Sequence, residues 1–180
     1  PGEIIHSSQC KNGQAFTGKQ VLVIGSGNSA AEIASKLTGH ARSVTVSVRT
    51  APHILPKSIY GIPLIGIGVW TRYWPTAWVD GILRFLQRSM IGDLSAYGLP
   101  YPELPLSKQY AINNVVPILY RPFVDDVRAG RITIVGPVQK ISGKTVHMLQ
   151  RIQTTHNHET EMVTAEPDVI IAGTGFRTGI

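Results

Sequence analysis

A short glycine-rich segment between an apolar strand and a helical pattern is the feature that most constrains the fold of this chain. Residues 21–24 are Val-Leu-Val-Ile, and four apolar residues in a row predict a buried strand of a parallel sheet. Residues 25–30 read Gly-Ser-Gly-Asn-Ser-Ala, and apolar residues then recur at helical spacing as far as Leu37. Residues 43–48 alternate like a second strand. This order of strand, turn, helix and strand predicts a βαβ unit within an α/β fold.

Three positions of this turn carry the residue types that a dinucleotide-binding turn requires. Gly25 permits the tight turn out of the strand, Gly27 lets a pyrophosphate approach the backbone, and Ala30 allows helix and strand to pack closely. The N–H groups and the dipole at the start of the helix would hold the phosphates. The segment therefore predicts a dinucleotide site, and the alternative is a glycine turn without a ligand. Further phosphate contacts, or a cap of the helix, are expected from Ser26, Asn28 and Ser29.

The end of the second strand predicts which dinucleotide binds. An acidic residue at this place accepts a hydrogen bond from the ribose 2′-hydroxyl of NADH, whereas an arginine accommodates the 2′-phosphate of NADPH. Arg49 stands 24 positions after Gly25, and residues 43–53 contain no acid. We therefore expect NADP(H) as the cofactor, with the 2′-phosphate bound by Arg49 together with Thr50. The alternative is a solvated arginine at the end of a strand.

The middle of the chain has weaker patterns. Residues 52–122 are rich in proline and are predicted to be irregular, apart from an amphipathic helix over residues 78–90. The apolar, glycine-containing segment 58–71 predicts a loosely held loop or an interfacial segment. Tryptophan recurs every four residues, and we expect these side chains in the core or at a domain interface: Trp70, Trp74 and Trp78.

The last third predicts a short helix, four short strands and a final buried strand. The helix is expected over 122–129 and the buried strand over 167–172. The short strands are expected to form an antiparallel meander: 132–135, 138–141, 145–149 and 162–164. Together these elements predict a Rossmann-like FAD/NAD(P)-binding fold, with a parallel sheet, helices on both of its faces and a small antiparallel β-meander.

Composition excludes several other classes. The chain has 17 Lys and Arg against 11 Asp and Glu, but these charges are scattered, so we expect no nucleic acid as partner. A single cysteine, Cys10, excludes a disulfide framework and a dithiol redox centre. The longest uncharged stretch, 58–71, is too short for a membrane span, which needs about 20 apolar residues. We expect no stable membrane span, no metal site and a cytoplasmic protein.

Several segments together resemble one known family. They are residues 2–9, 18–34, 48–56, 92–100, 128–132 and 168–177. In this order they are similar to the flavin-containing monooxygenases, above all to the bacterial and plant YUCCA-type members. The resemblance covers essentially the whole chain.

The resemblance implies more than the spacing of the residues shows. Family members hold FAD on one domain and NADPH on a second domain inserted into it. NADPH reduces FAD, dioxygen adds to give a flavin hydroperoxide, and this oxygenates a small organic substrate. Gly2-x-x-x-His6 is similar to the end of the family's identifying motif, so His6 and the adjacent Ser7 are expected near the cofactor. Thr174-Gly175 is similar to the motif where the chain returns to the FAD domain.

The resemblance also implies a division of the chain. Residues 1–17 would be a link from a missing FAD domain, 18–164 the NADP-binding domain, and 165–180 the return strand and hinge. The family's FAD fingerprint is absent, so we expect an excised or incomplete piece that is inactive by itself, and we assign no catalytic residue. Two departures are Cys10, where the family has an aromatic residue, and Gly173, where it has alanine. An NADPH-dependent flavoprotein reductase without oxygenation and a non-catalytic NADP-binding module stay open as alternatives.

Overall fold

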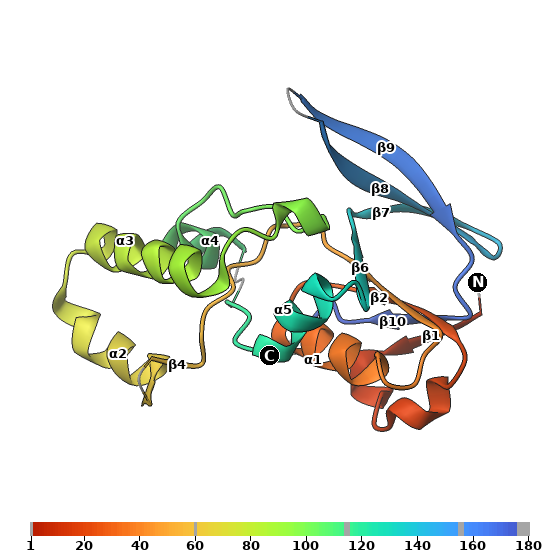
Figure 1. Cartoon of the computed structure of the whole chain (residues 1–180), viewed down its shortest axis with the longest axis horizontal. Coiled ribbons are helices and arrows are strands. Elements are labelled where there is room, and N and C mark those ends of the chain that lie inside the picture. The colour runs from red at the N-terminus through yellow and green to blue at the C-terminus, as the bar shows by residue number, and fades with distance from the viewer. Residues whose placement is uncertain (1, 60, 114–115, 155–156, 176–180) are drawn as a thin grey trace.

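A five-stranded parallel sheet forms the centre of the molecule (Figure 1). The computed structural model describes residues 2–59, 61–113, 116–154 and 157–175. The strand order is β1-β10-β2-β3-β6, and every neighbouring pair is parallel. The strands are β1 (Glu3–His6), β10 (Val169–Ala172), β2 (Gln20–Ile24), β3 (Ser43–Ser47) and β6 (Ile132–Val135). The predicted α/β class and the strands within 21–24, 43–48 and 167–172 are confirmed.

The prediction that residues 132–135 belong to the antiparallel meander is wrong. These residues form β6, which pairs in parallel with β3 through Val44 and Ile132, and through Val46 and Ile134. A parallel neighbour needs a crossover connection, usually a helix, before it. Helix α5 (Arg121–Arg128) supplies the last part of that connection, directly ahead of β6. The error arose because a short apolar strand does not itself reveal its partner.

The two faces of the sheet are covered by different elements. Side chains alternate across a strand, so Val21 and Val23 share one face of β2 while Leu22 lies on the other. The first face packs into a core with Ala30, Ala31, Ala34 and Leu37 of α1 (Asn28–Leu37) and with Phe123, Val124 and Val127 of α5. The second face, with Leu22 and Ile170, packs on Val146 and Met148 of the meander.

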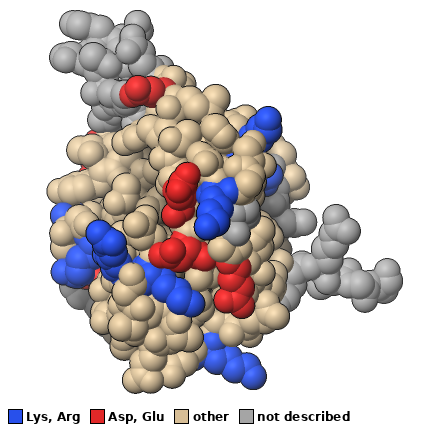
Figure 2. Space-filling model, turned by 90° about the vertical axis from the view of Figure 1, so that its right-hand side faces the viewer, with Lys and Arg blue, Asp and Glu red and all other residues tan. Residues whose placement is uncertain are grey.

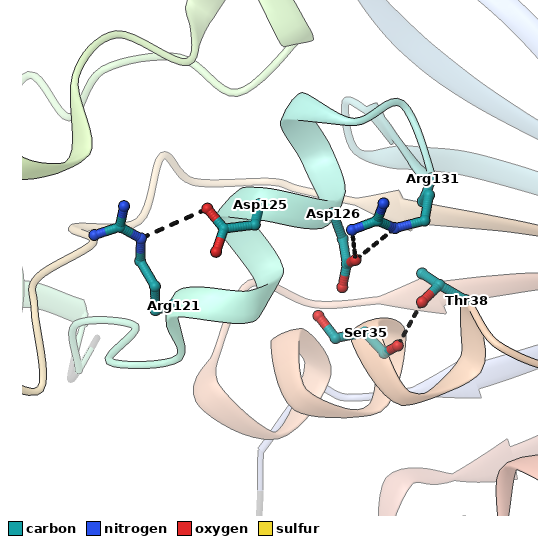
Figure 3. Close-up of polar contacts among 6 residues, drawn as sticks. All are labelled: Ser35, Thr38, Arg121, Asp125, Asp126 and Arg131. Atoms are coloured by element: carbon teal, nitrogen blue, oxygen red, sulfur yellow. Dashed lines mark hydrogen bonds and ion pairs between the residues drawn. The ribbon is translucent and has the colours of Figure 1, made fainter.

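The contact between α1 and α5 also contains polar groups (Figure 3). The buried carboxylate of Asp126 accepts two hydrogen bonds from Arg131, at 2.7 Å from Nη2 and 2.8 Å from Nε. Arg121 forms a second, more exposed ion pair with Asp125 on the same helix. Within α1, the backbone carbonyl of Ser35 accepts a hydrogen bond from the hydroxyl of the C-cap residue Thr38 at 2.7 Å. Helix α5 matches the helix predicted over 122–129 within one residue.

The antiparallel meander is longer than predicted. It consists of β7 (Val138–Ser142), β8 (Thr145–Thr154) and β9 (Asn157–Ala165) in that order. Figure 1 shows the β8–β9 hairpin projecting beyond the parallel sheet. Its first part is buried, with Val146 and Met148 against the sheet, whereas the predicted strands 145–149 and 162–164 covered only this inner half of the hairpin.

Residues 58–113, here called the helical excursion, were predicted to be irregular except for one helix, and this is largely wrong. They contain a two-stranded ribbon, three α-helices and shorter helical turns, which lie to one side of the sheet in Figure 1. The elements are β4 (Ser58–Ile59), β5 (Ile62–Pro63), α2 (Leu64–Trp70), η3 (Thr71–Tyr73), α3 (Thr76–Leu86), η4 (Gln87–Ile91), η5 (Ser95–Tyr97) and α4 (Leu106–Asn113). Two further short turns precede β2: η1 (Ser7–Gln9) and η2 (Gly13–Phe16).

The tryptophans of the excursion lie on the surface of the chain. Trp70 is 85% exposed, Trp78 is 68% exposed and Trp74 is half-exposed, so they do not pack in the core, and their place at a domain interface stays a prediction. Pro75 precedes α3, and the three residues therefore do not share one helix face. Among the described residues, no helix has both the length and the apolar content that a membrane crossing requires.

Candidate nucleotide-binding site

The predicted site residues follow one row of paired residues across the sheet. His6 of β1 lies opposite Ala172 of β10, which lies opposite Ile24 of β2, which lies opposite Ser47 of β3. Because the strands are parallel, their carboxyl ends meet at one edge. Chain order reverses between β2 and β10, and ligands of open α/β sheets bind outside the carboxyl ends at such a switch point. The residues that follow these ends are Ser7, Thr174, Gly175, Gly25 to Ala30, Arg49 and Thr50.

The two glycines of the turn have different structural requirements. Gly25 has a φ of +136°, and a Cβ atom there would lie 2.3 Å from the carbonyl oxygen of Gly173. Only glycine fits this position, because both the backbone angle and the neighbouring chain exclude a side chain. Gly27 has an ordinary φ of −94°, and a Cβ there would meet nothing within 4 Å. The space above Gly27 is therefore open, and a side chain would fill the place that a pyrophosphate would take.

Helix α1 begins directly at this open space. Gly27 is its N-cap, so no side-chain hydrogen bond from the N-cap satisfies the N–H groups of the first turn. The first turn carries no acidic residue that would oppose an anion. These N–H groups and the helix dipole favour a bound phosphate.

Ala30 packs helix α1 onto the end of β10. The Ala30 side chain is fully buried, and a Cβ added to Gly173 would lie 3.0 Å from the Ala30 Cβ. The methyl group at position 30 therefore occupies the space that a side chain at position 173 would need. This contact gives a physical reason for the departure at Gly173.

The polar side chains of the turn differ in how far hydrogen bonds within the protein already engage them. Asn28 donates from Nδ2 to the Pro117 carbonyl and accepts from the Leu119 amide, each at 2.8 Å, so its carboxamide fastens a distant loop. Its side chain does not cap α1, and a phosphate contact would come from its backbone N–H. Ser26 donates to the Thr50 carbonyl at 3.3 Å, which links the turn to the end of β3. Ser29 is exposed in the first turn of α1.

Arg49 and Thr50 line a cavity of about 720 Å³. Arg49 is exposed and Thr50 is half-buried, and both line the cavity with Ala51. The other lining residues come from the helical excursion, Arg88, Tyr101 and Gln109 among them, and from Thr160 of β9. The structure thus brings the predicted 2′-phosphate residues next to a cavity that residue patterns did not predict.

Two charged groups of this cavity are held by local contacts. The guanidinium of Arg88 lies over the Tyr101 ring, 5.4 Å from its centroid. Asp93 accepts a hydrogen bond from the Ser95 amide at 2.9 Å. The Ser95 hydroxyl and this amide lower the pKa of Asp93, so its carboxylate stays charged well into the acid range.

The family-derived residues lie on the far side of the turn from Arg49. His6 accepts at Nδ1 from the Ser8 amide at 3.3 Å and also contacts the Ser8 hydroxyl, and Ser7 is buried. Thr174 is exposed after β10, and Gly175 has a φ of +89°. His6 and Thr174 thus follow neighbouring strands, β1 and β10, while Arg49 follows β3 on the other side of β2. The site residues span the sheet edge rather than forming one cluster.

His53 has a structural role near the candidate site. It is buried, and its ring nitrogens contact Gln87 Oε1 at 3.2 Å and the Leu104 carbonyl at 2.9 Å. It therefore fastens two parts of the helical excursion, at Gln87 and Leu104, to the segment that follows β3. No group of three potential metal ligands occurs among the described residues.

Charges of both signs are mixed on the one face of the molecule that Figure 2 shows. On the face in Figure 2, Lys and Arg side chains alternate with Asp and Glu. This distribution agrees with the scattered charges of the sequence.

In sequence, the chain is similar to flavin-binding monooxygenases. The model of the flavin-binding monooxygenase-like family matches residues 1–73. The chain is 32% identical to indole-3-pyruvate monooxygenase YUCCA8 of Oryza sativa subsp. indica, over 99% of this chain and 40% of that protein. It spans about two fifths of the length of the curated relatives it matches.

Two solved structures share the fold. A structure of cyclohexanone monooxygenase with bound epsilon-caprolactone has a TM-score of 0.61 and 17% identity, and the match covers 97% of this chain and 43% of that one. A mutant flavin monooxygenase from Stenotrophomonas maltophilia has a TM-score of 0.51 and 17% identity, covering 99% of this chain and 36% of that one. Both matches extend over the helical excursion as well as the sheet.

Proposed function

We propose that the chain forms the NADPH-binding portion of a flavin-dependent monooxygenase, the kind of enzyme to which its sequence is similar. The observation that carries this proposal is the open space above Gly27, at the start of α1 and at the switch point of the sheet. The pyrophosphate of NADPH would lie there against the backbone N–H groups of the first helical turn. The 2′-phosphate would be bound by Arg49 and Thr50.

The chain's own residues would bind and orient the nucleotide. Gly25 and the Asn28 carboxamide hold the turn in shape, because one fits against Gly173 and the other bonds the loop at 117–119. His6, Ser7, Thr174 and Gly175, at the ends of β1 and β10, would lie toward the nicotinamide half and the flavin. FAD, when bound in the longer protein, supplies the redox chemistry. The dinucleotide turn in this chain is assigned to NADPH.

Titration with both nicotinamide cofactors tests the assignment. We expect the protein to bind NADPH more tightly than NADH by about 10- to 150-fold, because a charge-assisted hydrogen bond contributes about 1.5–3 kcal/mol. Arg49→Ala should reduce this preference to within a few fold, and Arg42→Ala, an exposed arginine ahead of β3, is the matched control. Equal affinities in the wild type, or an unchanged preference in Arg49→Ala, would contradict the proposal.

We further propose that the longer protein couples NADPH oxidation to oxygenation of a small organic substrate with dioxygen. The homology supports this reaction class, and the relatives' names concern indole-3-pyruvate and cyclohexanone. Oxygen uptake and NADPH consumption, measured with the FAD-loaded full-length enzyme, should rise together with one oxygenated product per NADPH. Consumption that yields hydrogen peroxide alone with every organic substrate would favour a reductase. A cytoplasmic location stays a prediction.

A further inference from the structure

Helix α3 presents its apolar face to the outside of the chain. Trp78, Ile82 and Phe85 are spaced by four and three residues, so they share one face of the helix. All three are exposed, Trp78 by 68% and Phe85 by 69%. The polar side of the helix is turned inward, because Asp80 accepts hydrogen bonds from the amide and the hydroxyl of Ser107 in α4. An amphipathic helix normally packs its apolar face against a core, so this orientation indicates an apolar surrounding outside the chain.

The exposed apolar surface continues into the segment that precedes α3. Trp70 at the end of α2, Tyr73 in η3 and Trp74 after it are each at least half exposed. Figure 1 shows α2 and α3 at the end of the molecule opposite β1. A group of large exposed apolar side chains marks an interaction surface. Six residues of this segment are here called the aromatic patch: Trp70, Tyr73, Trp74, Trp78, Ile82 and Phe85.

The residue types of the aromatic patch fit the boundary between a lipid bilayer and water. Trp and Tyr are enriched at this boundary, because their rings are apolar and carry one polar group. Four of the six side chains are Trp or Tyr, and they include every tryptophan of the chain. Aromatic rings are also enriched at interfaces between proteins, so the charges around the patch have to decide between the two.

These charges favour an anionic partner. Residues 58–92 contain three arginines and a single acid, Asp80, which is already bonded to Ser107. Arg84 is exposed on α3, and its long side chain lets the guanidinium reach a phosphate headgroup. Lys57, where the excursion begins, is exposed as well. A second copy of the same patch would bring the Arg84 groups together, whereas the one carboxylate of this segment is engaged elsewhere.

We propose that the aromatic patch binds the surface of a lipid bilayer with anionic headgroups. Helix α3 lies in the plane of the membrane, with Trp78, Ile82 and Phe85 at the boundary between headgroups and acyl chains. Arg84 contacts the headgroup phosphates. This binding is peripheral and requires no membrane span. It is independent of the proposed nucleotide site, which is formed by other residues, and therefore goes beyond the proposed function.

Vesicle binding measured through the tryptophans tests the proposal. Because all three tryptophans of the 180-residue chain belong to the patch, its intrinsic fluorescence reports on this surface alone. With vesicles of phosphatidylcholine mixed with phosphatidylserine, the emission should shift to shorter wavelength, and brominated acyl chains should quench it. Vesicles of phosphatidylcholine alone should bind the chain at least about fivefold more weakly, the effect of one basic residue near an anionic surface.

Two variants with matched controls separate the apolar and the charged contribution. Phe85→Ala should weaken binding to the mixed vesicles about tenfold, because the ring would otherwise leave water. Met162→Ala, at an exposed position on β9, should leave it unchanged. Arg84→Gln should weaken binding to the mixed vesicles about fivefold and barely affect binding to phosphatidylcholine. Arg42→Gln, at an exposed site ahead of β3, is its control. Urea denaturation checks that each variant is folded.

Each alternative occupant of the patch gives its own result. The proposal is overturned if the chain does not bind the mixed vesicles, or if Phe85→Ala binds them as well as the wild type. An emission shift that grows with protein concentration in the absence of lipid, with a dimer mass by light scattering, would mean that a second copy covers the patch instead. The FAD-loaded full-length enzyme should float with the mixed vesicles and lose this property in Phe85→Ala. If the enzyme stays behind while the 180-residue chain floats, the rest of the longer protein covers the patch, and the proposal fails.

Discussion

The parallel sheet buries its apolar side chains, whereas the helical excursion exposes many of its large ones. Val23 and Ile171 of the sheet are completely buried, whereas Trp78 and Phe85 of α3 are 68% and 69% exposed. None of the described residues of α3 is buried. The candidate site draws on both regions, with the glycine turn and Arg49 from the sheet and Arg88 and Gln109 from the excursion. The sheet thus fixes one half of the site through packing, and the other half depends on a few polar contacts.

Those polar contacts can be named. His53 bonds Gln87 and the Leu104 carbonyl, and Gln109 bonds the Ala51 carbonyl. Within the excursion, Asp80 of α3 accepts hydrogen bonds from the amide and the hydroxyl of Ser107, at the start of α4. The packed core of the sheet is held by many contacts, so one substitution removes only a few of them. Each hydrogen bond that holds the excursion, in contrast, is lost when a side chain that forms it is replaced. The two regions should therefore respond differently to mutation.

The largest effect is expected at Gly25, within the rigid region. Gly25→Ala should lower the free energy of unfolding by about 4 kcal/mol, because it adds a strained backbone angle to a clash with the Gly173 carbonyl. Urea denaturation measures the loss. Gly27→Ala is the matched control, since its added methyl group meets no protein atom. That variant should keep its stability to within about 0.5 kcal/mol and lose NADPH affinity.

Gly25 and Gly27 thus separate folding from binding within one turn. If Gly25→Ala were as stable as the wild type, the close approach of the turn to Gly173 would be incorrect. If Gly27→Ala bound NADPH normally, the pyrophosphate would not lie over this turn.

The second effect compares the two regions directly. Ile171→Ala should reduce the free energy of unfolding by about 3 kcal/mol, since it removes buried methylene groups from the core. Phe85→Ala, at an exposed position on α3, should change it by no more than about 0.5 kcal/mol. Both values come from chemical denaturation of the same protein preparation. A loss of similar size for the two variants would show that α3 is covered in solution, and the contrast between the regions would fail.

The third effect concerns the contact between Ala30 and Gly173. Gly173→Ala should cost about 1–2 kcal/mol of stability, because its methyl group would lie 3.0 Å from the Ala30 Cβ and 3.3 Å from the Ile24 carbonyl oxygen. Adding Ala30→Gly should relieve part of the crowding, so the double variant should be more stable than the two single losses predict by about 1 kcal/mol. A double-mutant cycle in urea measures this coupling. If the two losses of stability simply added, the methyl group at position 173 would not be crowded by Ala30.

The same contrast explains which parts of the molecule the sequence predicts. Residues 20–47 form β2, the glycine turn, α1 and β3 as predicted, because each element has a regular apolar pattern and these elements follow one another directly in the chain. Strand β6 was given to the wrong sheet since its partner β3 is distant in the sequence. Helix α2 was missed because Gly66 and Gly68 disfavour a helix.

The sequence did not predict helix α4 or its cavity residue Gln109, and the reason is a different one. In α4 the polar Gln109 is buried, while Tyr110 and Ile112 are more than half exposed, which reverses the pattern that marks an amphipathic helix. The residues at strand ends were found because position after a strand is a local property. Arg88, Tyr101 and Gln109 come together only through the folding of the excursion onto residues 49–51. The sequence analysis noted the segment 92–100 for its family resemblance, and this was the one signal that pointed to the part of the cavity wall that the excursion forms.

The smallest effect tests how completely the rigid region is optimised. The hydroxyl of Ser35 is buried at the α1–α5 interface and has no partner among the described residues, beside the Asp126–Arg131 pair (Figure 3). Ser35→Ala removes this unsatisfied group and adds helix propensity, so it should raise the free energy of unfolding by about 1 kcal/mol. Ser29→Ala, in the exposed first turn of α1, is the matched control, with an expected change within about 0.5 kcal/mol. Urea denaturation of both variants gives the comparison. A loss of stability in Ser35→Ala would mean that this hydroxyl donates to a neighbouring acceptor such as the Asp126 carboxylate, and the polar part of the α1–α5 contact would then be more extensive than the ion pair with Arg131.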